Sequence, residues 1–243
     1  MKKFKNIVAL GDSITKGVVY TASSNTQDSG MMTEGHYSIL DNGFVSQCAD
    51  YLGLPIANYG KMGCTVTHGS EILEQHRDVI AKSDITLIEY GGNDSDFSWY
   101  DIAESPDENH YPTTELPFFR QIYRDMISRV RDLGSMPVLL TLPLIDYRRF
   151  FAFVTRNMGD QARANVLSWL GGQEERIRNY HDMYSLAVYE VGMQERVPVI
   201  DITSPFLRNT DYTRYLCIDG IHPSQEGHDL IAHQVVKALS QMV

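Results

Sequence analysis

Short apolar runs alternate along this chain with longer stretches in which apolar residues recur at helical intervals. Five such runs, at residues 7–10, 54–59, 84–90, 137–142 and 197–201, have the length and apolar character of strands buried on both faces. Helical spacing occurs at residues 43–52, 69–81, 116–133, 161–170 and 174–192, and in a terminal helix that Ser224 caps. Alternating strands and helices without an internal repeat predict an α/β fold with a parallel, doubly wound sheet.

Two polar stretches interrupt this pattern. Residues 21–34 lack apolar periodicity and predict a surface loop. Residues 83–119 contain no Lys or Arg, and their aromatic residues cluster at Phe97, Trp99 and Tyr100. This second stretch is either a solvated acidic loop with aromatic anchors or a substrate rim that repels anions. Core positions, rather than a cofactor site, are predicted for Trp169, Tyr180, Tyr184, Leu186 and Val188.

Composition narrows the class of protein. A chain of 243 residues is long enough for one domain spanning residues 1–243. The net charge of −10 argues against nucleic acid as a partner, because binding there depends on Lys and Arg neutralising phosphates. No stretch is long and apolar enough to span a membrane, and the apolar run after residues 1–5 is too short for an export segment. We therefore expect a cytoplasmic protein.

Metal and disulfide chemistry have little support. The cysteines at positions 48, 64 and 217 are odd in number and lack the spacing of a zinc site or a disulfide framework. Of the scattered histidines, His228 and His233 would diverge on a helix. No metal site is predicted.

The candidate chemistry begins at Ser13, which follows the first predicted strand. Ligands bind at the carboxyl ends of the strands in open α/β sheets, so Ser13 is well placed for a nucleophile. A serine hydroxyl needs a base to take its proton, and His222 is the best candidate. Asp219 precedes it by three residues, so a turn can bring the carboxylate to the imidazole and fix its tautomer. Each of these motifs also describes an ordinary turn.

Two further residues could stabilise a developing oxyanion. Asn93 follows the third strand as Ser13 follows the first, so its amide could reach the same edge of the sheet. Gly63, in the loop after the second strand, could offer a backbone N–H. Both loops are also turn sequences in their own right.

In this order, the motifs resemble those of the SGNH hydrolases, also called the GDSL esterases and lipases. The four blocks of that family carry Ser, Gly, Asn and His. The matching segments here are Gly11-Asp12-Ser13-Ile14, Asn58-Tyr59-Gly60-Lys61-Met62-Gly63, Gly91-Gly92-Asn93-Asp94 and Asp219-Gly220-Ile221-His222-Pro223. Ile14 stands where Leu is common. The resemblance therefore covers almost the whole chain.

The resemblance implies a three-layer α/β/α flavodoxin-like fold and ester hydrolysis through an acyl-enzyme, without metal or cofactor. Ser13 would be the nucleophile, His222 the base and Asp219 the residue that orients it. The N–H groups of Ser13 and Gly63 and the side chain of Asn93 would form the oxyanion hole. Residues 95–116 and 143–197 lie outside the blocks, and we expect them to shape the substrate pocket as a rim or lid.

The substrate class stays open at this level. Short-acyl or acetyl esters of small molecules or carbohydrates fit the polar, acidic rim. A lysophospholipase or thioesterase would need a longer apolar groove. Outside catalysis, a doubly wound protein could bind a ligand at the same crevice, although no complete nucleotide-binding fingerprint is present.

Overall fold

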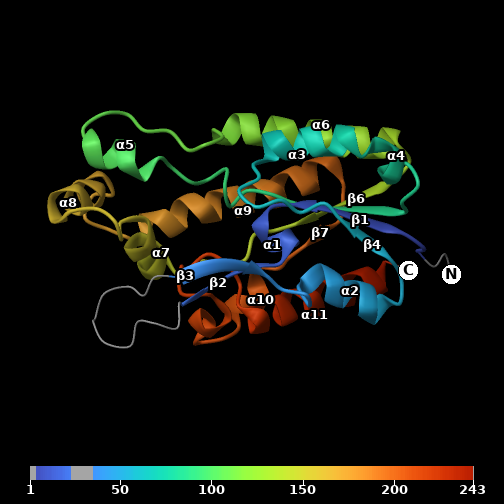
Figure 1. Cartoon of the computed structure of the whole chain (residues 1–243). Helices are drawn as coiled ribbons and strands as arrows, with labels where there is room; N and C mark the ends of the chain where they lie inside the picture. The colour runs from blue at the N-terminus through green and yellow to red at the C-terminus, as the bar shows by residue number, and fades with distance from the viewer. Residues whose placement is uncertain (1–3, 23–34, 243) are drawn as a thin grey trace.

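A parallel five-stranded sheet forms the centre of the computed structural model, which describes residues 4–22 and 35–242 (Figure 1). In spatial order the strands are β4 (Ile56–Asn58), β1 (Ile7–Gly11), β5 (Ile85–Glu89), β6 (Met136–Leu140) and β7 (Val199–Ile200). The predicted five-stranded parallel sheet is confirmed. Apart from β1, the strands are shorter than the apolar runs, because the ends of those runs turn into loops.

The central strand β1 shows why the sheet is buried on both faces. Val8 and Leu10 pack into one hydrophobic cluster, and Ile7 and Ala9 pack into another on the opposite side. Successive side chains of a strand point to opposite faces, so a continuous apolar run needs a helix layer on each side. The fold is therefore the predicted three-layer α/β/α arrangement.

Helices from different parts of the chain cover the two faces (Figure 1). One face is covered by α3 (Val66–Gln75), α4 (Arg77–Ile80), α6 (Leu116–Asp132) and α9 (Arg176–Glu195). The other face is covered by α2 (Phe44–Leu52), α10 (Ser204–Leu207) and α11 (Gln225–Gln241). Ser224 caps α11 as predicted, accepting a hydrogen bond from the backbone N–H of Gly227.

One predicted helix is wrong in its bounds. We expected a single helix over residues 69–81, but α3 already begins at Val66 and ends at Gln75, before α4 starts at Arg77. The early start follows from a tertiary contact, because the carboxylate of Asp94 accepts the N–H of Val66. The break lies at His76, whose backbone leaves helical geometry at φ −111°.

A third cluster of apolar residues lies beside the sheet, around α5 (Trp99–Glu104), α7 (Tyr147–Val154) and α8 (Asp160–Trp169). In Figure 1 these helices form a separate group at the end of α9 that is remote from β4. Phe97 and Trp99 are buried in this cluster, so residues 83–119 are not simply a solvated acidic loop. The chain between β5 and α6 contributes a helix and part of a core.

The structure also contains an antiparallel hairpin that the sequence pattern does not predict. It consists of β2 (Val18–Ala22) and β3 (Gly35–Ile39), with Tyr20 opposite Tyr37. Thr21 and Ala22 belong to β2 rather than to the predicted loop, and residues 23–34 of that loop lie outside the described residues. The remaining elements are α1 (Ser13–Lys16) and the 3₁₀ helix η1 (Tyr212–Tyr215).

Within the described chain, no helix combines the length and apolar character needed to cross a bilayer. The three cysteines are buried and unpaired with one another, as their spacing predicts.

Candidate active site

Ser13 is the first residue of α1, directly beyond the carboxyl end of β1. The side chain of Asp12 caps this short helix by accepting the N–H of Ile14 at 2.8 Å. Gly11 makes the turn possible, because a Cβ there would lie 2.0 Å from Thr15 Oγ1 and 2.9 Å from the carbonyl oxygen of Glu89. The backbone N–H of Ser13 lies in the first turn of the helix, where no intrahelical acceptor is available.

His222 lies on the loop before α11, and Asp219 shapes that loop locally. Asp219 Oδ1 accepts the N–H groups of Ile221 and His222, each at 3.2 Å. Gly220 adopts a left-handed conformation at φ +80°, and a Cβ there would lie 2.5 Å from the carbonyl oxygen of Asp146. Local hydrogen bonds therefore define the Asp-x-x-His turn, and the close approach of Asp146 requires glycine at position 220.

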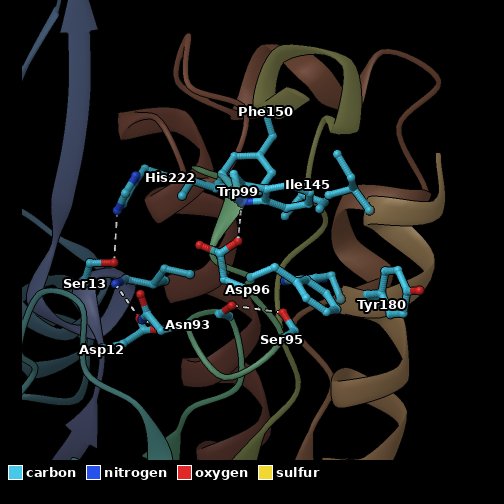
Figure 2. A pocket seen from close by; sticks show the side chains of 16 residues that line it. Asp12, Ser13, Asn93, Ser95, Asp96, Trp99, Ile145, Phe150, Tyr180 and His222 are labelled. Carbon is cyan, nitrogen blue, oxygen red and sulfur yellow. Dashed lines mark hydrogen bonds between the residues drawn. The ribbon is translucent and has the colours of Figure 1, made fainter. Parts of the chain in front are cut away.

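The structure brings the three predicted residues into a hydrogen-bonded series. Ser13 Oγ lies 2.9 Å from His222 Nε2, and His222 Nδ1 lies 2.6 Å from Asp219 Oδ2. Figure 2 shows the bond between Ser13 and His222 at the mouth of a pocket. All three residues are buried, with Asp219 at 0% exposure. In this geometry a neutral imidazole can donate from Nδ1 to the carboxylate and accept the serine proton at Nε2.

Asn93 reaches the same edge of the sheet from the loop after β5. Its Nδ2 donates to Asp12 Oδ2 at 3.1 Å and to the carbonyl oxygen of Cys64 at 3.2 Å. Gly63 precedes Cys64 and adopts a left-handed conformation at φ +70°. Gly63 does not line the pocket itself. It is linked to the site through the next residue, Cys64, whose carbonyl oxygen accepts the hydrogen bond from Asn93.

Asp94, the residue after Asn93, is fully buried and stabilises the loop that follows β5. Its two carboxylate oxygens both lie 3.1 Å from the N–H of Val66, which ties the start of α3 to the loop that holds Asn93. Burial raises the pKa of Asp94 to about 6. The same carboxylate thus fixes the two loops that carry Asn93 and Gly63.

A pocket that is partly open to solvent extends from Ser13 away from the sheet. Its walls combine apolar and aromatic side chains from the two segments that lie outside the sequence blocks. These include Phe97, Trp99, Ile145, Phe150, Ile177 and Tyr180. Residues 95–116 and 143–197 thus both contribute side chains to the pocket beside Ser13.

One carboxyl group stands among these apolar walls. Asp96 lies between Ser13 and Tyr180 in Figure 2, and its Oδ1 accepts the indole N–H of Trp99 at 2.8 Å. Burial raises the pKa of Asp96 to about 6. His181 also lines the pocket, and its Nδ1 has no hydrogen-bond partner among the described residues. The nearest carboxylate oxygen, on Asp182, is 3.7 Å from that nitrogen.

Sequence reasoning missed several of these pocket residues. In the sequence Asp96 is only one of several acidic residues in its stretch, although its position three residues after Asn93 places it near the site. Tyr180 packs against the third apolar cluster, as predicted for a core residue, and it also lines the pocket. Leu186 was also assigned to the core, yet it is 55% exposed on α9. The periodicity of that helix does not distinguish a side chain facing a pocket from one facing a core.

Across residues 4–22 and 35–242, no group of three or more His, Cys, Asp or Glu side chains is arranged to hold a metal ion. The described site thus offers a serine, an imidazole, a carboxylate and an amide as its chemical groups.

Comparisons with solved structures place this fold among known hydrolases. The lipase/acylhydrolase from Enterococcus faecalis matches with a TM-score of 0.65 at 22% identity, covering 98% of this chain and 96% of that one. Axe2, an acetylxylan esterase from Geobacillus stearothermophilus, matches with a TM-score of 0.62 at 21% identity, with the same coverage. A G-D-S-L family protein from Veillonella parvula matches with a TM-score of 0.60 at 15% identity, covering 98% and 99%. No curated protein sequence matches significantly.

The α/β fold and a match to a family model together define a carboxylic-ester hydrolase. A family model describes the GDSL-like lipase/acylhydrolase family and matches residues 9–230. This chain belongs to that family, as its four sequence blocks indicate.

Proposed function

We propose that the chain is a serine esterase that works through an acyl-enzyme on Ser13, with His222 as general base and Asp219 as its orienting partner. The observation that carries this proposal is the pair of short contacts at His222. One joins Nε2 to Ser13 Oγ at 2.9 Å, and the other joins Nδ1 to Asp219 Oδ2 at 2.6 Å. Residues 209 positions apart in the chain meet in hydrogen-bonding geometry that nucleophilic catalysis requires.

In the first half of the reaction, Ser13 Oγ attacks the ester carbonyl carbon and its proton passes to His222 Nε2. The carbonyl oxygen becomes an oxyanion, which we assign to the N–H groups of Ser13 and Gly63 and the amide of Asn93. The carbon–oxygen bond to the alcohol then breaks, and the alcohol leaves with the proton from His222. Asp219 stabilises the imidazolium that exists between these two proton transfers.

In the second half, a water molecule attacks the acyl-enzyme while His222 Nε2 accepts its proton. The bond to Ser13 Oγ breaks, the serine recovers a proton from the imidazolium, and the free acid departs. No step of this mechanism requires a metal or cofactor. The partner of the protein is then a small-molecule or carbohydrate ester.

We further propose that the preferred substrates carry short acyl groups. The pocket beside Ser13 contains the carboxyl group of Asp96, which is half-buried beside aromatic side chains and accepts the indole N–H of Trp99. A long alkyl chain would exclude water from that carboxyl group without offering it a hydrogen bond, which is unfavourable for a charged group. A hydroxyl-bearing alcohol, such as a sugar, would instead donate to it. The acetylxylan esterase of Geobacillus stearothermophilus, a structural neighbour, is consistent with this class.

Replacing Ser13 by Ala tests the catalytic assignment. We expect loss of p-nitrophenyl acetate hydrolysis and of labelling by a fluorophosphonate, with an unchanged circular dichroism spectrum. Ser46→Ala, on the exposed face of α2, is the matched control and should behave as the parent enzyme. Retained activity in Ser13→Ala would contradict the mechanism. Absent labelling of the parent, together with tight binding of an intact ligand, would favour a non-catalytic binding protein.

A series of p-nitrophenyl esters from acetate to palmitate tests the substrate class. We expect kcat/KM to be highest for the shortest acyl groups and to fall with chain length. A maximum at long chains would contradict the short-acyl proposal and favour a lysophospholipase or thioesterase. Acetylated sugars assayed in parallel show whether the alcohol side of the substrate contributes.

A further inference from the structure

Two carboxyl groups are buried together beneath the nucleophile. Asp12 and Glu89 are each 1% exposed, and the register of β1 and β5 places Gly11 opposite Glu89. The two carboxyl groups hydrogen-bond to each other. Neither forms a salt bridge with a Lys or Arg of the described chain. The pair is therefore a buried acidic site with no cation to balance it.

This arrangement requires one proton on the pair. A hydrogen bond between two carboxyl groups needs a proton on one of them, and two adjacent buried carboxylates repel each other. Burial raises the pKa of both groups, and repulsion from Glu89 raises the pKa of Asp12 further. With one shared proton, the pair carries one negative charge rather than two.

Hydrogen-bond donors surround both carboxyl groups. Asp12 accepts an N–H on each oxygen, from Ile14 at 2.8 Å and from Asn93 at 3.1 Å. Glu89 accepts the hydroxyl of Thr15 on Oε2 at 2.8 Å, and hydrogen bonds from the backbone of Asp12 and Thr15 lower its pKa against the effect of burial. The two groups thus share one proton, and two N–H donors hold the side chain of Asp12 in place.

We infer that Asp12 is a positioning residue that holds Asn93 in register with the nucleophile. One oxygen of Asp12 fixes the helix that carries Ser13, and the other fixes the amide of Asn93. When an oxyanion forms, the Asn93 N–H that points to the carbonyl of Cys64 turns to it, because a charged acceptor binds more strongly. The second N–H keeps its bond to Asp12. This role rests on the proposed function of Ser13 and Asn93.

Asp12→Asn tests the acceptor directly. The Asn oxygen can still cap Ile14, but its NH₂ group then faces the NH₂ group of Asn93. We expect kcat to fall by about 10²–10³, the usual effect of losing one oxyanion donor, while KM changes little. Asp50→Asn, on the exposed surface of α2, is the matched control. A kcat equal to that of the parent enzyme would overturn the inference.

Two variants of Glu89 test the shared proton. Gln can donate an N–H to Asp12 in place of the shared proton, so Glu89→Gln should retain most of the kcat that Glu89→Leu loses. Equal loss in both variants would contradict a hydrogen bond between the side chains at positions 12 and 89. Melting temperatures identify any variant that fails to fold, and the Gln variant, which matches Glu in shape, keeps the comparison with the parent enzyme possible.

A double-mutant cycle shows whether Asp12 acts through Asn93. Introduced into Asn93→Ala, Asp12→Asn should reduce kcat by far less than it does in the parent enzyme, because the group it positions is already absent. Multiplicative effects would mean that Asp12 acts by another route. If Ser13→Ala abolishes activity and Asp12→Asn does not lower it, the inference alone fails. If Ser13→Ala stays active, the proposed function itself fails.

Discussion

The ring of Tyr37 lies edge-on against the imidazole of His222, with ring centroids 5.5 Å apart and ring planes at 71°. Tyr37 belongs to β3, and its ring is held in turn by Tyr20 of β2, whose centroid is 4.7 Å away. Through this contact the hairpin covers the open side of the imidazole. Tyr37 is still 41% exposed, so it also forms part of the outer surface beside the site.

Removal of this ring should weaken catalysis modestly. An aromatic pair contributes about 0.5–1.5 kcal/mol beyond the area it buries, so we expect Tyr37→Ala to lower kcat about 2- to 10-fold. Tyr37→Phe keeps the ring and should retain the parent kcat more closely. Tyr51→Ala serves as the control, since Tyr51 is 73% exposed on α2. Steady-state kinetics with p-nitrophenyl acetate provide the measurement, and an unchanged kcat in Tyr37→Ala would show that the contact is dispensable.

Replacing Asp219 by Asn should impair the base without removing it. The Asn side chain can present an N–H to His222 Nδ1, which favours the tautomer with its proton on Nε2. That nitrogen then cannot accept the proton of Ser13, and we expect kcat to fall by about 10⁴, as in a serine protease with the equivalent exchange. Asp211→Asn, an exposed position on the same segment, is the control. A loss below tenfold would argue against an orienting role for Asp219.

Asp94 should make stability depend on pH. Burial raises its folded pKa to about 6 from a usual value of 3.8, so the folded state binds this proton more tightly than the unfolded state. The stabilisation is present in full below about pH 4 and is lost as the pH rises through 6. Relative to Asp94→Asn, the parent enzyme should therefore lose about 2–3 kcal/mol of unfolding free energy between pH 4 and pH 7.

Urea unfolding of both proteins at these two pH values measures the difference, and other carboxyl groups cancel in the comparison. Asp132→Asn, at an exposed position on α6, should show no such pH-dependent difference from the parent enzyme. A constant difference between Asp94→Asn and the parent would mean that Asp94 titrates alike in the folded and unfolded states.

Asp96 should select against anionic acyl groups. Its carboxyl group lies in the pocket and has a pKa of about 6, so it is mostly ionised at pH 8. A second negative charge in the same pocket would be repelled. We expect the parent enzyme to prefer p-nitrophenyl acetate over the hemisuccinate ester, and Asp96→Asn to narrow the ratio of the two kcat/KM values about tenfold or more. Asp101→Asn, exposed on α5, is the control. An unchanged ratio would exclude Asp96 from this role.

Much of the fold could be predicted because its signals are local. The apolar run at β1 predicts a strand buried on both faces, since each successive side chain needs an apolar neighbour. The spacing of Asp219 and His222 predicts their contact, because three residues fit within one turn. The hairpin of β2 and β3 lacks such a signal, because six of its ten residues are exposed and no apolar periodicity marks its strands.

By itself, the sequence determined the alternation of strands and helices, the order of the four blocks and the chemical groups that the site contains. Only the tertiary structure decided that Asp12 meets Glu89, that Tyr37 covers His222 and that Tyr180 and Asp96 share a pocket. Each of these contacts joins side chains far apart along the chain or on different elements. Periodicity reports which face of an element is apolar, but the partner of that face is set by how the elements pack.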